Sequence, residues 1–176
     1  MTAFPLMLIV NRHIPAAADL APSDTAGTRV RLDWDTRCKS RFDARDSADR
    51  HIAVILPRGT VLRGGDSLIA EDGSRIVVEA ARQPLLRIQI AGTRGEPSDL
   101  VRAAYHLGNR HVQLEVEGDF LQIEPDPVLA AMLVRMGLTV TEVAAPFEPE
   151  AGAYAPSGHT HSDHGGHPDH DDPGHS

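Results

Sequence analysis

The hydrophobic pattern of the chain changes close to Gln83 and Pro84, and this change limits the folds open to it. Before that point, short apolar runs alternate with polar residues at a period of two, and pairs that contain glycine separate them. Asp72-Gly73, between two apolar runs, is the strongest hairpin signal. No helical period is seen there, so the pattern predicts about six short strands in residues 1–82, forming a β-rich domain of sandwich or barrel type.

Residues 83–146 combine strands with two helical patterns. The predicted elements, in chain order, are a strand over 85–91, a helix over 99–110 with Ser98 as its N-cap, a hairpin turning at 117–119, a helix over 126–137 with Asp126 as its N-cap and Pro127 in its first turn, and a strand over 138–146. The order βαββαβ is that of a ferredoxin-like domain. The expected fold class is therefore α+β.

The end of the chain, residues 147–176, has no hydrophobic period and is rich in His, Asp, Gly and Pro. This composition is typical of a tail without fixed structure. No Lys or Arg follows Arg135, so most of the net charge of -8 falls on this end and the rest of the chain is nearly neutral. Without a basic stripe, a nucleic-acid partner is not expected.

The sequence also lacks the signals of export and of membrane insertion. The apolar run near the N-terminus has no basic segment before it and no cleavage site, and no apolar stretch reaches the length of a membrane span. The chain has a single cysteine, which excludes a disulfide framework within it. A cytoplasmic protein with no membrane partner is expected.

Six of the ten histidines lie in the tail: His159, His161, His164, His167, His170 and His175. Neutral imidazole is a common ligand of nickel, zinc and copper, and steps of two or three residues let neighbouring imidazoles reach one ion by closing small loops. A purification tag would have consecutive histidines, and a merely solvated tail would favour Glu, Lys and Ser. Metal binding is the favoured interpretation, and the identity of the metal stays open.

Two further histidines, His106 and His111, flank the Gly-Asn pair that is predicted to end the first helix. His111 is expected to open the next strand at an exposed edge. The ordinary alternative is that a histidine near a helix C-terminus interacts with the helix dipole and binds nothing. Cys38 lies in a polar loop beside Arg37 and Lys39, which could lower the pKa of its thiol, but no base partner is identifiable. Without a nucleophile–base set, a carboxylate pair or a phosphate loop, no enzymatic activity is expected.

The stretches "LPRGTVLRGGD", "YHLGNRHVQLEVE" and "APFEPEAGAY", followed by the His-rich tail, occur here in one chain and in this order. Together they resemble the UreE family of urease accessory proteins, which are nickel metallochaperones. The resemblance implies a β-rich domain followed by a ferredoxin-like metal-binding domain. It also implies a homodimer in which the histidine of "GNRH", here His111, meets its twin across the two-fold axis and binds one metal per dimer. His159 and His161 are the nearest further ligands by this resemblance, and His106 is an auxiliary site at most.

By the same resemblance, the chain captures Ni(II) and passes it to the accessory GTPase UreG, which feeds the complex that assembles the urease active site. Zinc and copper are alternative occupants of the same histidine sites. A second hypothesis is a general metal buffer or storage protein that acts through its tail alone. The two hypotheses differ at His111, which the buffer does not need.

Overall fold

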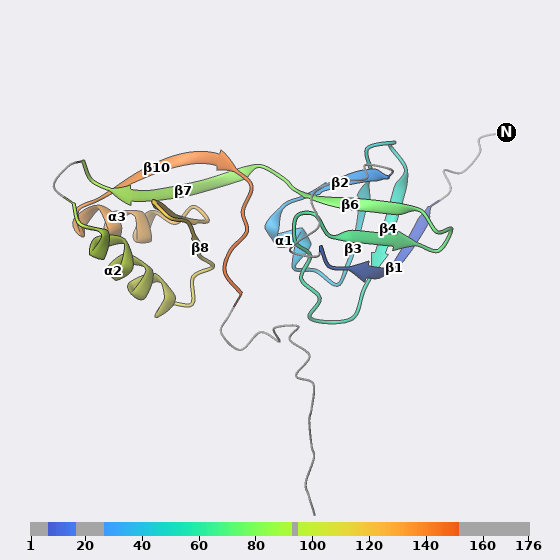
Figure 1. Cartoon of the computed structure of the whole chain (residues 1–176), viewed down its shortest axis with the longest axis horizontal. Coiled ribbons are helices and arrows are strands. Elements are labelled where there is room, and N and C mark those ends of the chain that lie inside the picture. Colours follow the sequence, from blue (N-terminus) through green and yellow to red (C-terminus); the bar gives the residue numbers. More distant parts are fainter. Residues whose placement is uncertain (1–6, 17–26, 93–94, 152–176) are drawn as a thin grey trace, which may run out of the picture.

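The computed structural model describes residues 7–16, 27–92 and 95–151. They form two sheets, one before and one after residue 82, with two longer helices beside the second (Figure 1). This is the α+β class that the sequence predicts. In the part of the chain that is described, no helix combines the length and the apolar character needed to cross a bilayer.

The first sheet has six strands, β1 (Leu8–Ile14), β2 (Thr28–Leu32), β3 (Arg41–Arg45), β4 (His51–Ile55), β5 (Ser67–Ala70) and β6 (Arg75–Ala80). Their order is β2-β6-β5-β1-β4-β3, with β1–β4 and β2–β6 parallel and the other pairs antiparallel. The two edge strands approach each other: just after β3, the Ser47 N–H donates to the carbonyl of Arg29 in β2 at 2.7 Å. The sheet is therefore barrel-like, and the inward side chains of its strands, among them Val10, Ile52 and Ile76, form one buried core.

Residues 35–46, which the sequence suggests to be a polar loop, contain most of a short helix and all of a strand. The helix α1 (Trp34–Arg37) is capped by Asp33, whose carboxylate accepts the Thr36 N–H at 2.9 Å. In β3, Phe42 and Ala44 pack against the core, while the alternating residues Arg41, Asp43 and Arg45 are exposed. Two apolar side chains in a strand of five residues give too weak a period to be recognised from sequence, so this strand was not predicted.

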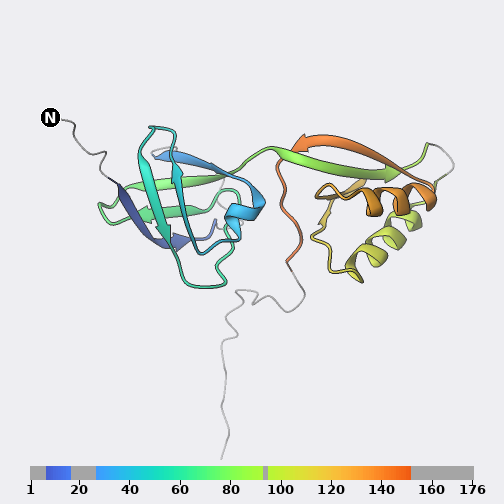
Figure 2. The same ribbon diagram turned by 180° about the vertical axis from the view of Figure 1, so that it is seen from behind.

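The second sheet is formed by β7 (Gln83–Ile90), β8 (Glu115–Val116), β9 (Phe120–Ile123) and β10 (Leu138–Ala145), with α2 (Pro97–Gly108) and α3 (Pro127–Arg135) between them in sequence. The strand order β10-β7-β9-β8, antiparallel throughout, is that of the ferredoxin-like fold, as predicted. Both helices lie on one face of this sheet, as Figure 1 and the reversed view of Figure 2 show. Their inward side chains, such as Leu107 and Leu133, form a second buried core with Ile88.

The ends of the helices confirm one predicted cap and correct the other. Asp126 caps α3, accepting the N–H groups of Val128 and Leu129 at 2.8 and 2.9 Å. By contrast α2 begins at Pro97, before the predicted cap Ser98, and its N-cap is Glu96. The proline suits the first helical position, and the carboxylate of Asp99 accepts the Glu96 N–H at 2.9 Å, so the helix starts two residues earlier than predicted.

The chain leaves β10 through a short segment, residues 146–150, here named the strap, which descends between the two domains in both views (Figures 1 and 2). Its Phe147 is fully buried in a third cluster with Trp34, Leu85 and Ala145, and its ring meets the Trp34 ring edge-on at 6.1 Å. The expectation that residues 147–150 belong to an unstructured tail is therefore wrong. One aromatic residue among prolines and glutamates makes no period, and its burial depends on a partner more than a hundred residues earlier.

Candidate metal centre

His111 occupies the turn that ends α2, in a backbone conformation that few non-glycine residues adopt. Its φ is 56°, in the left-handed region. The His111 N–H donates to the Gly108 carbonyl at 2.9 Å and the Val112 N–H to the Leu107 carbonyl at 3.3 Å. These two bonds define a Schellman motif, in which the left-handed position usually holds glycine. A histidine there costs about 1 kcal/mol of backbone strain, and such a cost at a defined position is typical of functional residues.

Packing on either side of the turn explains why His111 and not Gly108 takes this conformation. Val112 follows the turn and packs, partly buried, against the cluster that contains fully buried Leu107. An apolar pair at these two positions commonly accompanies the Schellman motif. The expectation that His111 opens the next strand is therefore wrong: the strand β8 begins only at Glu115. The spacing of Leu107 and Val112 around four consecutive non-core residues is the signal that could have predicted the turn.

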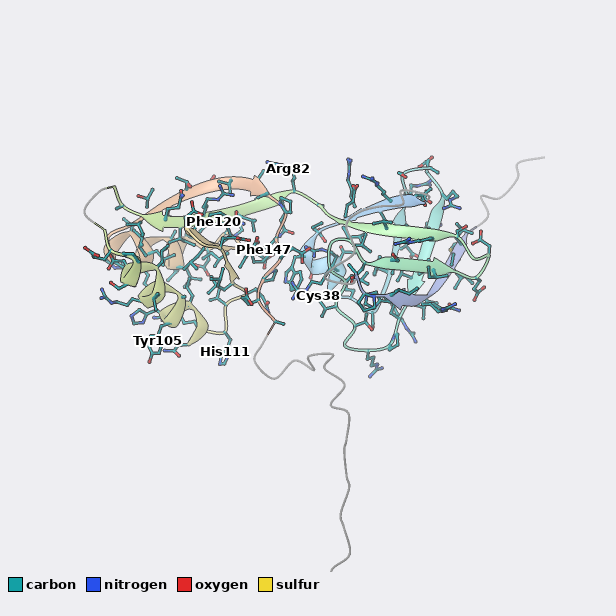
Figure 3. The ribbon with its side chains drawn as sticks, in the orientation of Figure 1. Cys38, Arg82, Tyr105, His111, Phe120 and Phe147 are labelled. Carbon is teal, nitrogen blue, oxygen red and sulfur yellow. The ribbon has the colours of Figure 1, made fainter. Side chains whose placement is uncertain are left out.

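The His111 side chain is exposed at the end of the C-terminal domain. Figure 3 shows His111 and Tyr105 on the same side of this domain, both projecting away from the sheet. No hydrogen bond to the His111 ring is found among the described residues. An exposed neutral imidazole offers a nitrogen lone pair to a metal ion.

An apolar stripe on α2 leads toward His111. Val101 and Tyr105 are 70% and 64% exposed and lie four residues apart, hence on one face of the helix, and Gly108 continues that face with open space above it. Large exposed apolar side chains on one face often mark a contact surface. The sequence gives this stripe no prominence, because alanine and leucine on the opposite face of α2 dominate the apolar pattern.

His106, the other candidate in this helix, is partly buried in its last turn. Its ring packs edge-on against Tyr105, with the ring centroids 5.5 Å apart. In the described ranges 7–16, 27–92 and 95–151, no three His, Cys, Asp or Glu side chains are grouped so that they could hold a metal ion. The tail candidates, His159, His161, His164, His167, His170 and His175, lie outside the described residues.

Comparison with known proteins covers nearly the whole chain. Residues 10–81 match the sequence model of the N-terminal domain of the UreE urease accessory protein, and residues 83–175 match that of its C-terminal domain. The chain belongs to the UreE family of urease accessory proteins. The family is non-catalytic, and membership implies a role in the nickel maturation of urease.

Individual members of the UreE family are similar over most of their length. The urease accessory protein UreE of Albidiferax ferrireducens is 57% identical over 165 residues, which are 93% of this chain and 94% of that protein. The UreE proteins of Paracidovorax citrulli and of a Polaromonas species are 59% and 56% identical, over 87% and 90% of this chain and 73% of each relative. The resemblance inferred from the sequence motifs is thereby confirmed.

In this UreE-family chain, the surroundings of Cys38 and of His13 in the N-terminal domain are those of structural residues. Partial burial raises the pKa of the Cys38 thiol, by more than the charges of Arg37 and Arg63 lower it. The expectation of a lowered pKa is therefore wrong: the Arg37 charge does act in that direction, but desolvation of the thiol outweighs it. His13 Nε2 lies 2.7 Å from the carboxylate of Asp66, which is buried and also accepts two backbone N–H groups.

Proposed function

We propose that the chain is a nickel metallochaperone that binds one Ni(II) between two copies of itself and delivers it, through the GTPase UreG and the urease assembly complex, to the urease active site. The observation that carries this proposal is the exposed His111, which the fold holds in a left-handed turn at the end of an exposed apolar stripe. The cytoplasm is the proposed location, since UreG and urease assembly would be met there.

The apolar stripe supports a homodimer. In a two-fold interface the same patch of both subunits is buried, so residues beside the axis meet their own copies. Contact between the Val101 and Tyr105 side chains of two copies would remove two exposed apolar groups from water in each subunit. With the interface at this stripe, the two His111 imidazoles approach the axis from both sides and supply two ligands to one ion.

The remaining ligands come, in this proposal, from the tail. His159 and His161 are nearest in sequence; His164, His167, His170 and His175 add capacity, and His106 is auxiliary. A site with one fixed imidazole per subunit, completed by imidazoles of the tail, can be dismantled by stepwise ligand exchange, whereas a closed four-ligand structural site retains its metal. Zinc and copper would bind the same imidazoles, so selectivity for nickel rests on supply and geometry.

A metal buffer or storage protein is the second candidate function, and the six tail histidines favour it. Nickel titration by calorimetry, with the mass from light scattering, separates the two. The proteins are the full chain and a full-length variant with all six tail histidines replaced by asparagine. As a chaperone the variant stays dimeric and keeps one nickel ion per two chains, losing only further ions. A variant that binds no nickel would instead support the buffer.

Acidification should release the nickel. The charged imidazolium has no lone pair for a metal, so a histidine site weakens as the pH falls through the ordinary imidazole pKa of about 6.5. We expect most nickel to stay bound at pH 7.5 and to be lost on equilibrium dialysis at pH 5. Retention at pH 5 would indicate carboxylate ligands, which stay ionised down to about pH 4, and would contradict histidine ligation.

A further inference from the structure

The N-terminal domain binds the strap through three consecutive residues. One carboxylate oxygen of Glu148 accepts hydrogen bonds from Arg37 Nη1 at 2.7 Å and from the Gly64 N–H at 2.8 Å, and the other lies 3.2 Å from Arg63 Nη1. Arg37 also donates to the Phe147 carbonyl, and Arg63 to the Pro149 carbonyl at 2.7 Å. The path of the chain beyond β10 is thus determined by side chains of the other domain.

The opposite side of the strap is bonded to the segment that follows His111. The Glu148 N–H donates to a carboxylate oxygen of Glu115 at 2.9 Å, and the Glu150 N–H donates to the Leu114 carbonyl at 2.8 Å. Leu114 is three residues from His111, and three residues span at most about 11 Å. The root of the His-rich tail is therefore held close to the candidate metal ligand.

The ion pair that holds the strap is not a surface pair. The Arg37 side chain is fully buried, and the guanidinium groups of Arg37 and Arg63 both lie over the Trp34 ring, with their central carbons 5.1 and 4.8 Å from its centroid. A buried guanidinium without its carboxylate is strongly unfavourable, so this arrangement specifies one partner and one strap path.

We infer that Glu148 is a positioning residue for the metal site: through Arg37 and Arg63 it holds the root of the tail beside His111, so that the N-terminal domain sets how often tail imidazoles reach the metal. This inference rests on the proposed function. Counted from Glu150, His159 is nine residues away; with the strap released, the fixed point becomes Ala145, fourteen residues away. Effective concentration falls as about the −3/2 power of tether length, which gives about a twofold loss from length alone and more when the fixed point also moves away.

The position of the tail can be tested without any metal. A nitroxide spin label is attached at residue 155 by Ala155→Cys in a full-length Cys38→Ser background, and the paramagnetic broadening of the backbone amides of residues 112–117 is measured by NMR. We expect strong broadening in the parent and at least a halving of the added relaxation rate in the double variant Arg37→Met, Glu148→Gln. Replacing both partners leaves no unpaired buried charge.

The matched control is Arg31→Met with Glu79→Gln, the same exchange in an ion pair of β2 and β6 that does not involve the strap. It should leave the broadening unchanged. Glu148→Gln alone, which keeps the shape of the side chain, is the second variant if the double variant fails to fold, and a smaller decrease is expected from it. Unchanged broadening in a folded strap variant, or an equal decrease in the control, would overturn the inference.

Measuring nickel affinity then tests whether the position of the tail root affects metal binding. The strap variant should bind nickel at least about twofold more weakly in the full chain, and equally well when all six tail histidines are asparagine. An equal loss in both backgrounds would show that the strap acts only on the fold, and would overturn the positioning role. The spin-label result stands even if His111 binds no nickel, so failure of the inference and failure of the proposed function are distinguishable.

Discussion

Replacing His111 with glycine should abolish the tight nickel site and leave the fold intact. Mutating a residue that only hydrogen-bonds to a metal ligand lowers metal affinity by about 10- to 100-fold. Loss of a ligand itself from each subunit should therefore weaken nickel binding at least about 100-fold. The dissociation constant would be measured by competition with a chromophoric chelator, in the background that lacks the tail histidines.

The unusual backbone of His111 makes this a clean substitution. Glycine adopts a φ of 56° without strain, which relieves about 1 kcal/mol, but it gains more freedom in the unfolded chain, which costs about as much. The free energy of unfolding in urea should thus change by less than about 0.5 kcal/mol. His111→Asn, which also tolerates the left-handed region, should behave in the same way.

His106→Asn is the matched control, since it removes an imidazole from the same end of α2. We expect it to change nickel affinity by only a few-fold. If, in the full chain, His111→Gly and His111→Asn bind nickel as the parent does, while replacement of the tail histidines removes all binding, the chaperone proposal fails at its central residue and the buffer remains.

The second large effect is expected in the strap, where Phe147→Ala should lower the free energy of unfolding by about 3–5 kcal/mol. Phe147 is fully buried among Trp34, Leu85 and Ala145, and its removal leaves a cavity at the junction of the two domains. Urea unfolding of the full-length variant, followed by the fluorescence of the single tryptophan, measures the change close to the cavity.

Val128→Ala provides the comparison, because Val128 is 73% exposed on α3 and its truncation should change stability by no more than about 0.5 kcal/mol. A change this small in Phe147→Ala would mean that the strap does not belong to the folded core. That result would also remove the basis for its positioning role.

The sequence predicts well what depends on local patterns. Alternation over β2 and the turn at Asp72-Gly73 predict strands because side chains alternate between the two faces of a sheet. Asp126 before Pro127 predicts the start of α3 because the cap needs only neighbouring N–H groups. The order of these elements was sufficient for the ferredoxin-like fold, and the three quoted stretches together with the His-rich tail were sufficient for the family.

The tertiary structure decided what depends on packing against the rest of the fold. His111 lies in a left-handed turn because Leu107 and Val112 share one core, and no local propensity of histidine requires this. Phe147 and Glu148 look like the beginning of a tail, yet they are fixed because Trp34 and Arg37, more than a hundred residues earlier, would otherwise expose an aromatic ring and leave a buried charge unpaired. Local pattern thus identified the elements and the family, whereas long-range packing and charge pairing decided where the chain leaves the fold beside the candidate ligand.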